Sequence, residues 1–156
     1  YYNQGNQPCL HISWLFNHAG RPSLSQKWVR SILDAFYGTD GIHGYGYGQD
    51  EDQGQLGAWY VISSIGLFDV AGLANADAQL SVGSPLFDKV TIELNPAYYP
   101  GKHFTIETVN NSTENKYVQT YTLNGESLHQ PSLAFKDLVK GGHLKLEMGA
   151  TPVDKY

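Results

Sequence analysis

The chain has 156 residues, of which 41% are hydrophobic and 16% are charged, and this composition excludes an intrinsically disordered protein. A formal net charge of −5 argues against a nucleic-acid partner, which would need clustered lysine and arginine. No apolar run approaches the roughly 20 residues needed to span a bilayer, and one cysteine, Cys9, cannot form an internal disulfide framework.

The first third of the chain has the pattern of two helices. Apolar residues between Cys9 and Ala19 predict a largely buried helix that stops at the next glycine. A second helix begins with Ser23 or Ser25 as its cap and ends at Gly38. Its apolar residues recur at helical spacing, and they are Trp28, Val29, Ile32, Leu33 and Phe36.

A glycine-rich loop comes next and leads into three adjacent acids, Asp50, Glu51 and Asp52. A third helix then runs to Gly66. We expect its apolar residues to face inward, and these are Leu56, Trp59, Tyr60 and residues 62–65.

After residue 85 the period of the apolar residues changes to two, which predicts strands with one buried face. The expected strands cover residues 89–94, 103–109, 117–123 and 143–148. Asn124-Gly125 is a hairpin-turn signal, because both residues tolerate a positive φ, and Gly141-Gly142 marks another turn.

This order predicts an α+β fold, with helices in residues 1–70 and an antiparallel β region in residues 71–156. Three helices without a second layer cannot cover Trp14, Trp28 and Trp59 on all sides. We therefore expect an upstream part of the same polypeptide to pack against them.

Two polar segments could carry chemistry. Residues 4–8 read QGNQP, and the amide and backbone oxygens there are ligands that a hard cation such as calcium prefers. In residues 44–55, glycines let the backbone approach a ligand. The acids at 50–52 fit either a helix capping box with Gln53 or a catalytic role, in which Asp50 and Asp52 point the same way from an extended lead-in. A helix N-terminus would favour their ionised forms, as a base requires.

These segments and their flanks resemble glycoside hydrolase family 92, the calcium-dependent exo-α-mannosidases. The resemblance rests on GNQP at 5–8, HISWLFNHAGRP at 11–22, QKWVR at 26–30, GQDEDQGQLGAWYV at 48–61 and GSPLFDKV at 83–90. The blocks stand in the family's order and cover nearly the whole chain. Many members have glutamate where this chain has Gln7.

The resemblance implies a fold and a mechanism. The helices would be the last ones of an (α/α)6 catalytic barrel with the base-bearing loop at 38–55, followed by a β-sandwich-like region. Members hydrolyse terminal α-linked mannose with inversion, using Ca²⁺ that contacts the sugar. Asp50 and Asp52 match the family's base region. The general acid is a glutamate upstream of these blocks, and nothing in this chain matches it, so we expect the chain alone to be inactive.

The same resemblance implies the remaining site residues and partners. Gln4 and His11 would bind substrate, while Asn6 and Gln7 would bind calcium. The partners would be a mannose-containing glycan and the upstream part of the polypeptide. Action on glycans implies a periplasmic or extracellular location.

Two other functions are compatible with parts of the sequence. A non-catalytic carbohydrate-binding module would use the strand-rich half and its tyrosines, but it has no need of acids beside a glycine loop. A nucleotide-sugar glycosyltransferase would use Asp50-Glu51-Asp52 as a metal-binding D-x-D motif. Such a motif follows an apolar strand among alternating β and α units, whereas here the acids lead into a helix.

Overall fold

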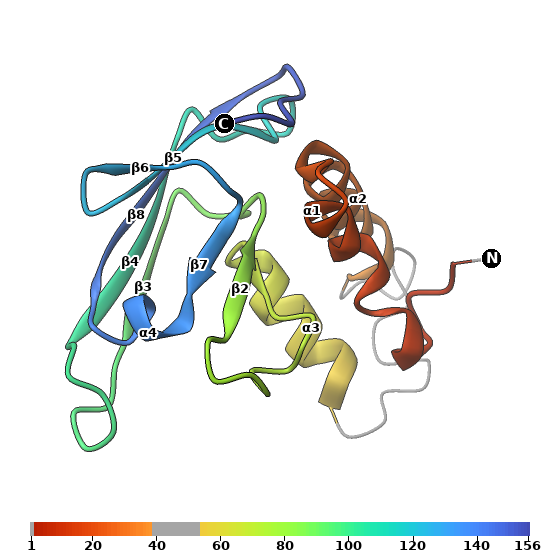
Figure 1. Ribbon diagram of the computed structural model, residues 1–156. Helices are drawn as coiled ribbons and strands as arrows, with labels where there is room; N and C mark the ends of the chain where they lie inside the picture. Colours follow the sequence, from red (N-terminus) through yellow and green to blue (C-terminus); the bar gives the residue numbers. More distant parts are fainter. Residues whose placement is uncertain (1, 39–53) are drawn as a thin grey trace.

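The computed structural model describes residues 2–38 and 54–156 of the chain. Helices occupy one side of the molecule and strands the other, which confirms the α+β class (Figure 1). Within the described residues, no helix is both long and apolar enough to cross a membrane.

Short helical turns precede the first long helix. They are η1 (Gln7–Cys9), η2 (Ile12–Trp14) and α1 (Leu15–His18), and they are followed by α2 (Pro22–Phe36). The predicted serine caps are wrong, because α2 begins at Pro22, where a missing N–H costs nothing. Instead, the Ser23 N–H donates to the Asp154 carboxylate at 3.0 Å, and the Ser25 hydroxyl accepts from the backbone N–H of Asn17.

Helix α3 (Gln55–Ser64) has Gly54 as its N-cap, and the φ of 76° at Gly54 suits a residue without a Cβ. The predicted end is confirmed, since Gly66 leaves the helix with a φ of 82° and lies so close to Pro85 that a side chain would collide. Tyr60 on α3, which was predicted to face inward, is 37% exposed, and Trp28 on α2 is 46% exposed.

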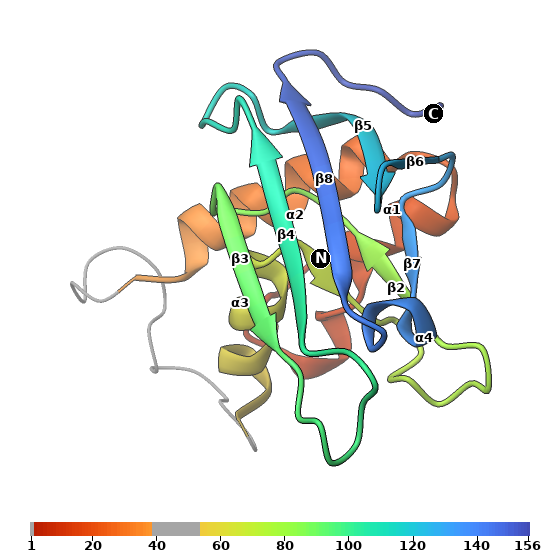
Figure 2. The same cartoon turned by 90° about the vertical axis from the view of Figure 1, so that its left-hand side faces the viewer.

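The strands form two sheets. A three-stranded antiparallel sheet has the order β1 (Leu67–Phe68), β2 (Gln79–Val82) and β7 (Ser132–Ala134). A five-stranded sheet has the order β3 (Lys89–Glu93), β4 (His103–Val109), β8 (Gly142–Gly149), β5 (Tyr117–Leu123) and β6 (Glu126–Leu128). Figure 2 shows the larger sheet in front of α2.

The expectation of a purely antiparallel β region is wrong at one place, because β4 and β8 pair in parallel. Parallel strands need a long crossover, and here the chain leaves the large sheet after β6, passes through β7 and helix α4 (Phe135–Leu138), and re-enters as β8. The hairpin prediction is confirmed, since Asn124 and Gly125, with φ values of 53° and 88°, join β5 to β6.

The molecule has two clusters of buried apolar side chains. One, between the sheets, draws on both of them, as in a sandwich, and includes Leu80, Leu133, Phe104, Ile106 and Leu146. The other lies among the helices and includes Trp14, Val29, Leu33, Leu56 and Trp59. The two clusters are in contact with each other's elements: Ile62 and Ile65 of α3 pack against the cluster between the sheets, and Phe68 of β1 packs against the helical cluster. The division into two domains at residues 70 and 71 stays a prediction.

Two buried polar side chains of α2 join the helices to the strands. Gln26 is fully buried, donates to the Tyr121 hydroxyl at 2.9 Å and accepts from the Val118 N–H at 3.0 Å. The backbone N–H of Val118 thus has a hydrogen-bond acceptor at the point where the register between β5 and β8 shifts. Arg30 donates to the carbonyl of Ser112 at 3.1 Å and to that of Pro85, and burial lowers its pKa.

Candidate functional site

A buried amide lies at the centre of the N-terminal polar segment. Gln4 is only 1% exposed. Its Oε1 accepts from the Tyr2 hydroxyl, and its Nε2 donates to the Tyr37 hydroxyl at 2.9 Å. The Tyr37 hydroxyl donates in turn to the backbone carbonyl of Leu56 at 3.2 Å. We call these four residues the Gln4 network. Burial is the main reason that the pKa of Tyr2 rises to about 12, so its hydroxyl keeps its proton at neutral pH.

The Gln4 network joins the two residues that flank the acidic segment, residues 38–55, to the N-terminal segment. Tyr37 directly follows α2, and Leu56 lies in the first turn of α3. Asp50 and Asp52 lie between them in sequence and outside the described residues. The chain therefore enters and leaves its acidic segment at points that are tied to Gln4.

Aromatic packing reinforces this junction. The Tyr37 ring stacks on Trp59 at 5.7 Å between centroids and contacts Tyr60 at 4.8 Å. The indole N–H of Trp59 donates to the carbonyl of Leu10 at 2.8 Å. Helix α3 is thus fixed against the N-terminal segment independently of Gln4.

The start of α3 excludes the capping-box interpretation of the acids. Gly54 is the N-cap, and no acidic residue stands in the first turn. Asp50 therefore does not hold the N-cap position that a capping box with Gln53 would require.

The predicted metal ligands differ in exposure. Asn6 is exposed and makes no side-chain capping bond to η1, while its backbone carbonyl accepts from the Cys9 N–H at 2.8 Å. Gln7 is half-buried. Among the residues that the structure describes, the amide oxygen of Asn6 accepts no hydrogen bond, and its chemistry fits a calcium ion. Both candidates are neutral, and in residues 2–38 and 54–156 no three His, Cys, Asp or Glu side chains group to hold a metal.

The two predicted substrate-binding residues have different environments. His11 is exposed beside the start of η2 and makes no side-chain capping bond, so its ring can meet a ligand. Gln4 is occupied by two tyrosine hydroxyls. Its substrate-binding role stays a prediction. Tyr2 and Tyr37 were not foreseen, because a hydroxyl partner 33 residues away leaves no local sequence signal.

Comparison with known proteins identifies related chains. Residues 1–150 match the model of the glycosyl hydrolase family 92 catalytic domain. A protein of Arthroderma benhamiae described as an uncharacterized secreted glycosidase is 30% identical over 149 residues, which are 93% of this chain and 18% of that protein.

Solved structures agree with that match. The family GH92 α-mannosidase BT3965 of Bacteroides thetaiotaomicron superposes with a TM-score of 0.84 at 32% identity, over 98% of this chain and 19% of that one. The family GH92 inverting mannosidase BT2199 of the same species superposes with a TM-score of 0.80 at 33% identity, over 96% and 19%. This chain thus spans about a fifth of the length of these relatives.

Proposed function

The chain belongs to glycosyl hydrolase family 92, and from this membership we propose that it is the C-terminal part of an inverting exo-α-mannosidase that removes terminal α-linked mannose from glycans. The observation that carries the proposal is the Gln4 network. It ties Tyr37 and Leu56, which flank the 38–55 segment that contains Asp50 and Asp52, to Gln4 of the oxygen-rich residues 4–8. A base and a cation site are the two parts that such chemistry requires from this region.

In the proposed reaction, Asp50 and Asp52 hold and deprotonate the water that attacks the anomeric carbon. An inverting glycosidase needs an acid on the opposite side of the sugar, with the two carboxyl groups roughly 6.5–9.5 Å apart. The acid protonates the leaving oxygen as the C–O bond breaks. Because the sequence offers no match to that acid, we propose that the upstream part of the polypeptide supplies it.

We propose further that Asn6 and Gln7 contribute neutral oxygen ligands to Ca²⁺. The ion would contact sugar hydroxyls and orient the ring. Gln7 supplies an amide where many relatives supply a carboxylate, and calcium affinity depends on ligand charge. His11 is exposed beside this segment and would contact the substrate.

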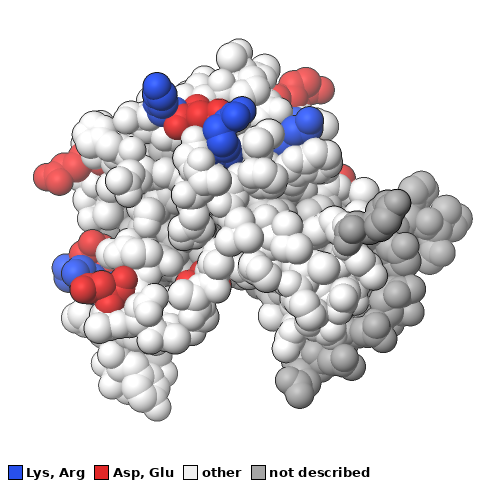
Figure 3. All heavy atoms as spheres, turned by 45° about the vertical axis from the view of Figure 1, so that its right-hand side comes forward, with Lys and Arg blue, Asp and Glu red and all other residues white. Residues whose placement is uncertain are grey.

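An apolar groove supports the proposal that the upstream part packs here. It has a volume of about 530 Å³ and lies between the N-terminal segment and α2, lined by Tyr2, Ile12, Phe16, Trp28, Ile32 and Phe36. Beyond the groove, Val61 of α3 is 63% exposed. In Figure 3 the charged side chains of the described residues lie mainly at the top and the left. Such apolar surface is costly in water and is typical of a surface that other protein covers.

No described feature favours a non-catalytic binding module or a glycosyltransferase. The small sheet is antiparallel and the large one has a single parallel pair, unlike the alternating β and α units around a D-x-D motif. The relative described as secreted supports export to the periplasm or the outside of the cell.

The test is hydrolysis of an aryl α-mannoside by the complete polypeptide, with NMR detection of the mannose anomer released first. We expect β-mannose, loss of activity with a calcium chelator, and recovery on adding Ca²⁺. Initial release of α-mannose would contradict inversion, and absence of hydrolysis would contradict the proposed activity. The 156-residue chain assayed in parallel should release no mannose.

A further inference from the structure

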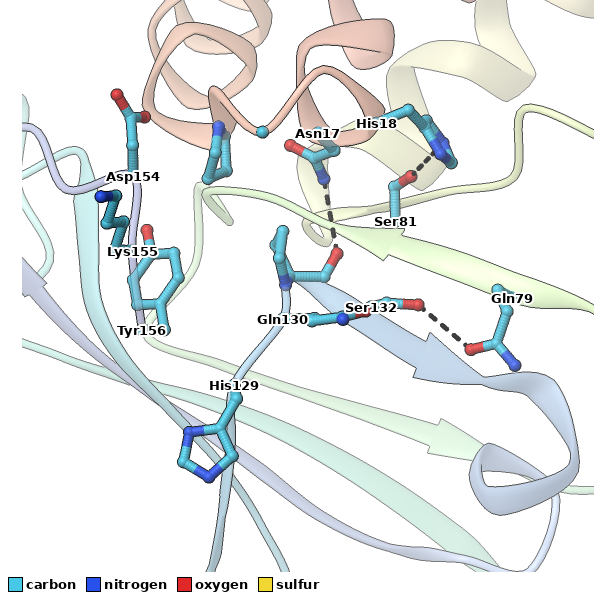
Figure 4. A pocket seen from close by; sticks show the side chains of 13 residues that line it. Asn17, His18, Gln79, Ser81, His129, Gln130, Ser132, Asp154, Lys155 and Tyr156 are labelled. Carbon is cyan, nitrogen blue, oxygen red and sulfur yellow. Dashed lines mark hydrogen bonds between the residues drawn. The ribbon is translucent and has the colours of Figure 1, made fainter.

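A second pocket, of about 650 Å³, lies at the other end of α2 from the Gln4 network. The connection between α1 and α2, the edge formed by β2 and β7, and residues 154–156 enclose it (Figure 4). Helix α2 has 15 residues, which at about 1.5 Å each places the two ends roughly 20 Å apart. The pocket is therefore separate from the Gln4 network.

The walls of this pocket are held by contacts between distant parts of the chain. The side-chain amide of Asn17 donates to the carbonyl of Val82 at 3.1 Å. Arg21 and Asp154 form an ion pair at 2.8 Å. The Tyr156 hydroxyl, in the same segment as Asp154, donates to the carbonyl of Val118 at 3.1 Å. These contacts make the cavity preformed, as small-ligand sites usually are.

The polar groups left for a ligand include an amide, an imidazole and one ammonium group. Gln130, His129 and Lys155 make no side-chain hydrogen bond or ion pair with the part of the chain that the structure describes. Asp154 is the single acid of the lining. Burial works to raise its pKa, but hydrogen bonds from Ser23 and Arg21 lower it overall, so it stays ionised and already paired.

This combination fits a saccharide better than an ion. Sugar hydroxyls donate and accept hydrogen bonds, as amides and neutral imidazoles also do. The ring of Tyr156 and the side chain of Pro131 offer apolar surface to the C–H faces of a sugar. One unpaired lysine gives too little charge to select an anion, and no free carboxylate is present in the lining to attract a cation.

We propose that this pocket binds a saccharide segment of the glycan substrate, away from the residue being hydrolysed. The inference rests on the proposed action on glycans. A second site would hold a polymeric substrate near the catalytic site and raise its effective concentration, while a one-sugar substrate would gain nothing.

The test compares two substrates on the complete polypeptide, an aryl α-mannoside and a soluble α-mannan, together with retardation in a gel that contains the mannan. For Gln130→Ala combined with Lys155→Ala, we expect at least about fivefold weaker retardation and a similar loss of kcat/KM on mannan. Activity on the aryl mannoside should be unchanged. Lys102→Ala, an exposed lysine outside the pocket, should match the wild type.

The failures of the two proposals are distinguishable. Wild-type retardation of the double variant, or no retardation of the wild type, overturns the pocket proposal while aryl mannosidase activity persists. Retardation by a sulfated polysaccharide but not by mannan also overturns it, since the pocket then selects anions. Absence of aryl mannoside hydrolysis by the wild type overturns the proposed function itself.

Discussion

The side-chain amide of Gln4 donates a hydrogen bond to the Tyr37 hydroxyl at 2.9 Å, between residues 33 positions apart. Through Tyr37 the bond continues to the carbonyl of Leu56, so one buried amide is linked to both ends of the acidic segment. A group in this position need not touch substrate to matter. A shift of about 1 Å in a positioned catalytic group can lower a rate about 100-fold.

Gln4→Ala in the complete enzyme should therefore lower kcat at least about tenfold. Tyr37→Phe removes only the hydroxyl and should lower kcat in the same direction, with a melting temperature close to that of the wild type. Gln55→Ala, an exposed glutamine at the start of α3, is the matched control. Wild-type kcat in Tyr37→Phe would show that the network does not position the site.

Calcium dependence should respond to charge at position 7. Gln7→Glu adds a carboxylate and should lower the calcium concentration for half-maximal activity several-fold, because carboxylates bind calcium more strongly than amides do. Asn6→Ala removes an oxygen ligand and should raise that concentration. Calcium titration of activity and calorimetry would measure both effects. Identical calcium curves for wild type and both variants would exclude residues 6 and 7 from the metal site.

Gln26 should be important for stability. Gln26→Ala leaves the Val118 N–H without its partner and opens a gap between α2 and β5. We expect a loss of about 2–4 kcal/mol in the free energy of unfolding, measured by urea denaturation. Ser31→Ala on the exposed side of α2 should change it by less than about 0.5 kcal/mol. A similar small change for Gln26→Ala would contradict the structural role.

Tyr2 should contribute to loss of stability at alkaline pH. Its pKa is about 12 in the folded chain against an ordinary value of 10.0, so folding favours the protonated form. This stability is complete below pH 10 and is lost as the pH rises through 12. Tyr2→Phe should make the fall in unfolding free energy over this window shallower, although buried Tyr121 keeps part of it. Tyr98→Phe, at a side chain that is 79% exposed, should keep the wild-type slope.

The sequence predicts best where local pattern and packing agree. Strands β4 and β5 have the predicted bounds, because each buries one face, and Asn124-Gly125 ends β5. Strands β1, β2 and β7 were not predicted, since they have only two to four residues. In β2, Leu80, Ser81 and Val82 are all buried, so no alternation is visible.

Contacts between distant residues explain the other errors. Asp154 interacts with the start of α2 from 131 residues away, a partner that no local cap motif reveals. Tyr60 has a helical spacing that predicts burial, yet the described chain leaves it exposed. For the candidate site, residue types could be predicted from the sequence, whereas the hydrogen bonds that gather the ends of the acidic segment could not.

The division of labour between Asp50, Glu51 and Asp52 is the most direct test of the catalytic proposal. Helix α3 has Gly54 as its N-cap and no acid in its first turn, so these three residues are not needed to cap it. An inverting base must stay ionised and hold a water on the far face of the sugar. Asp50→Asn and Asp52→Asn should each lower kcat at least about 100-fold, the low end for removing a general base.

Glu51→Gln should lower kcat far less. If the chain before α3 is extended, as the sequence predicts, the side chain of residue 51 points to the opposite side from those of Asp50 and Asp52. The value of kcat should be measured on the complete enzyme with an aryl α-mannoside. Thermal melts of all three variants control for folding. Added azide could rescue Asp50→Asn or Asp52→Asn by replacing the nucleophilic water, a response that a purely structural carboxylate would not give. Wild-type turnover in both aspartate variants would remove these residues from the mechanism and require the base to lie elsewhere in the polypeptide.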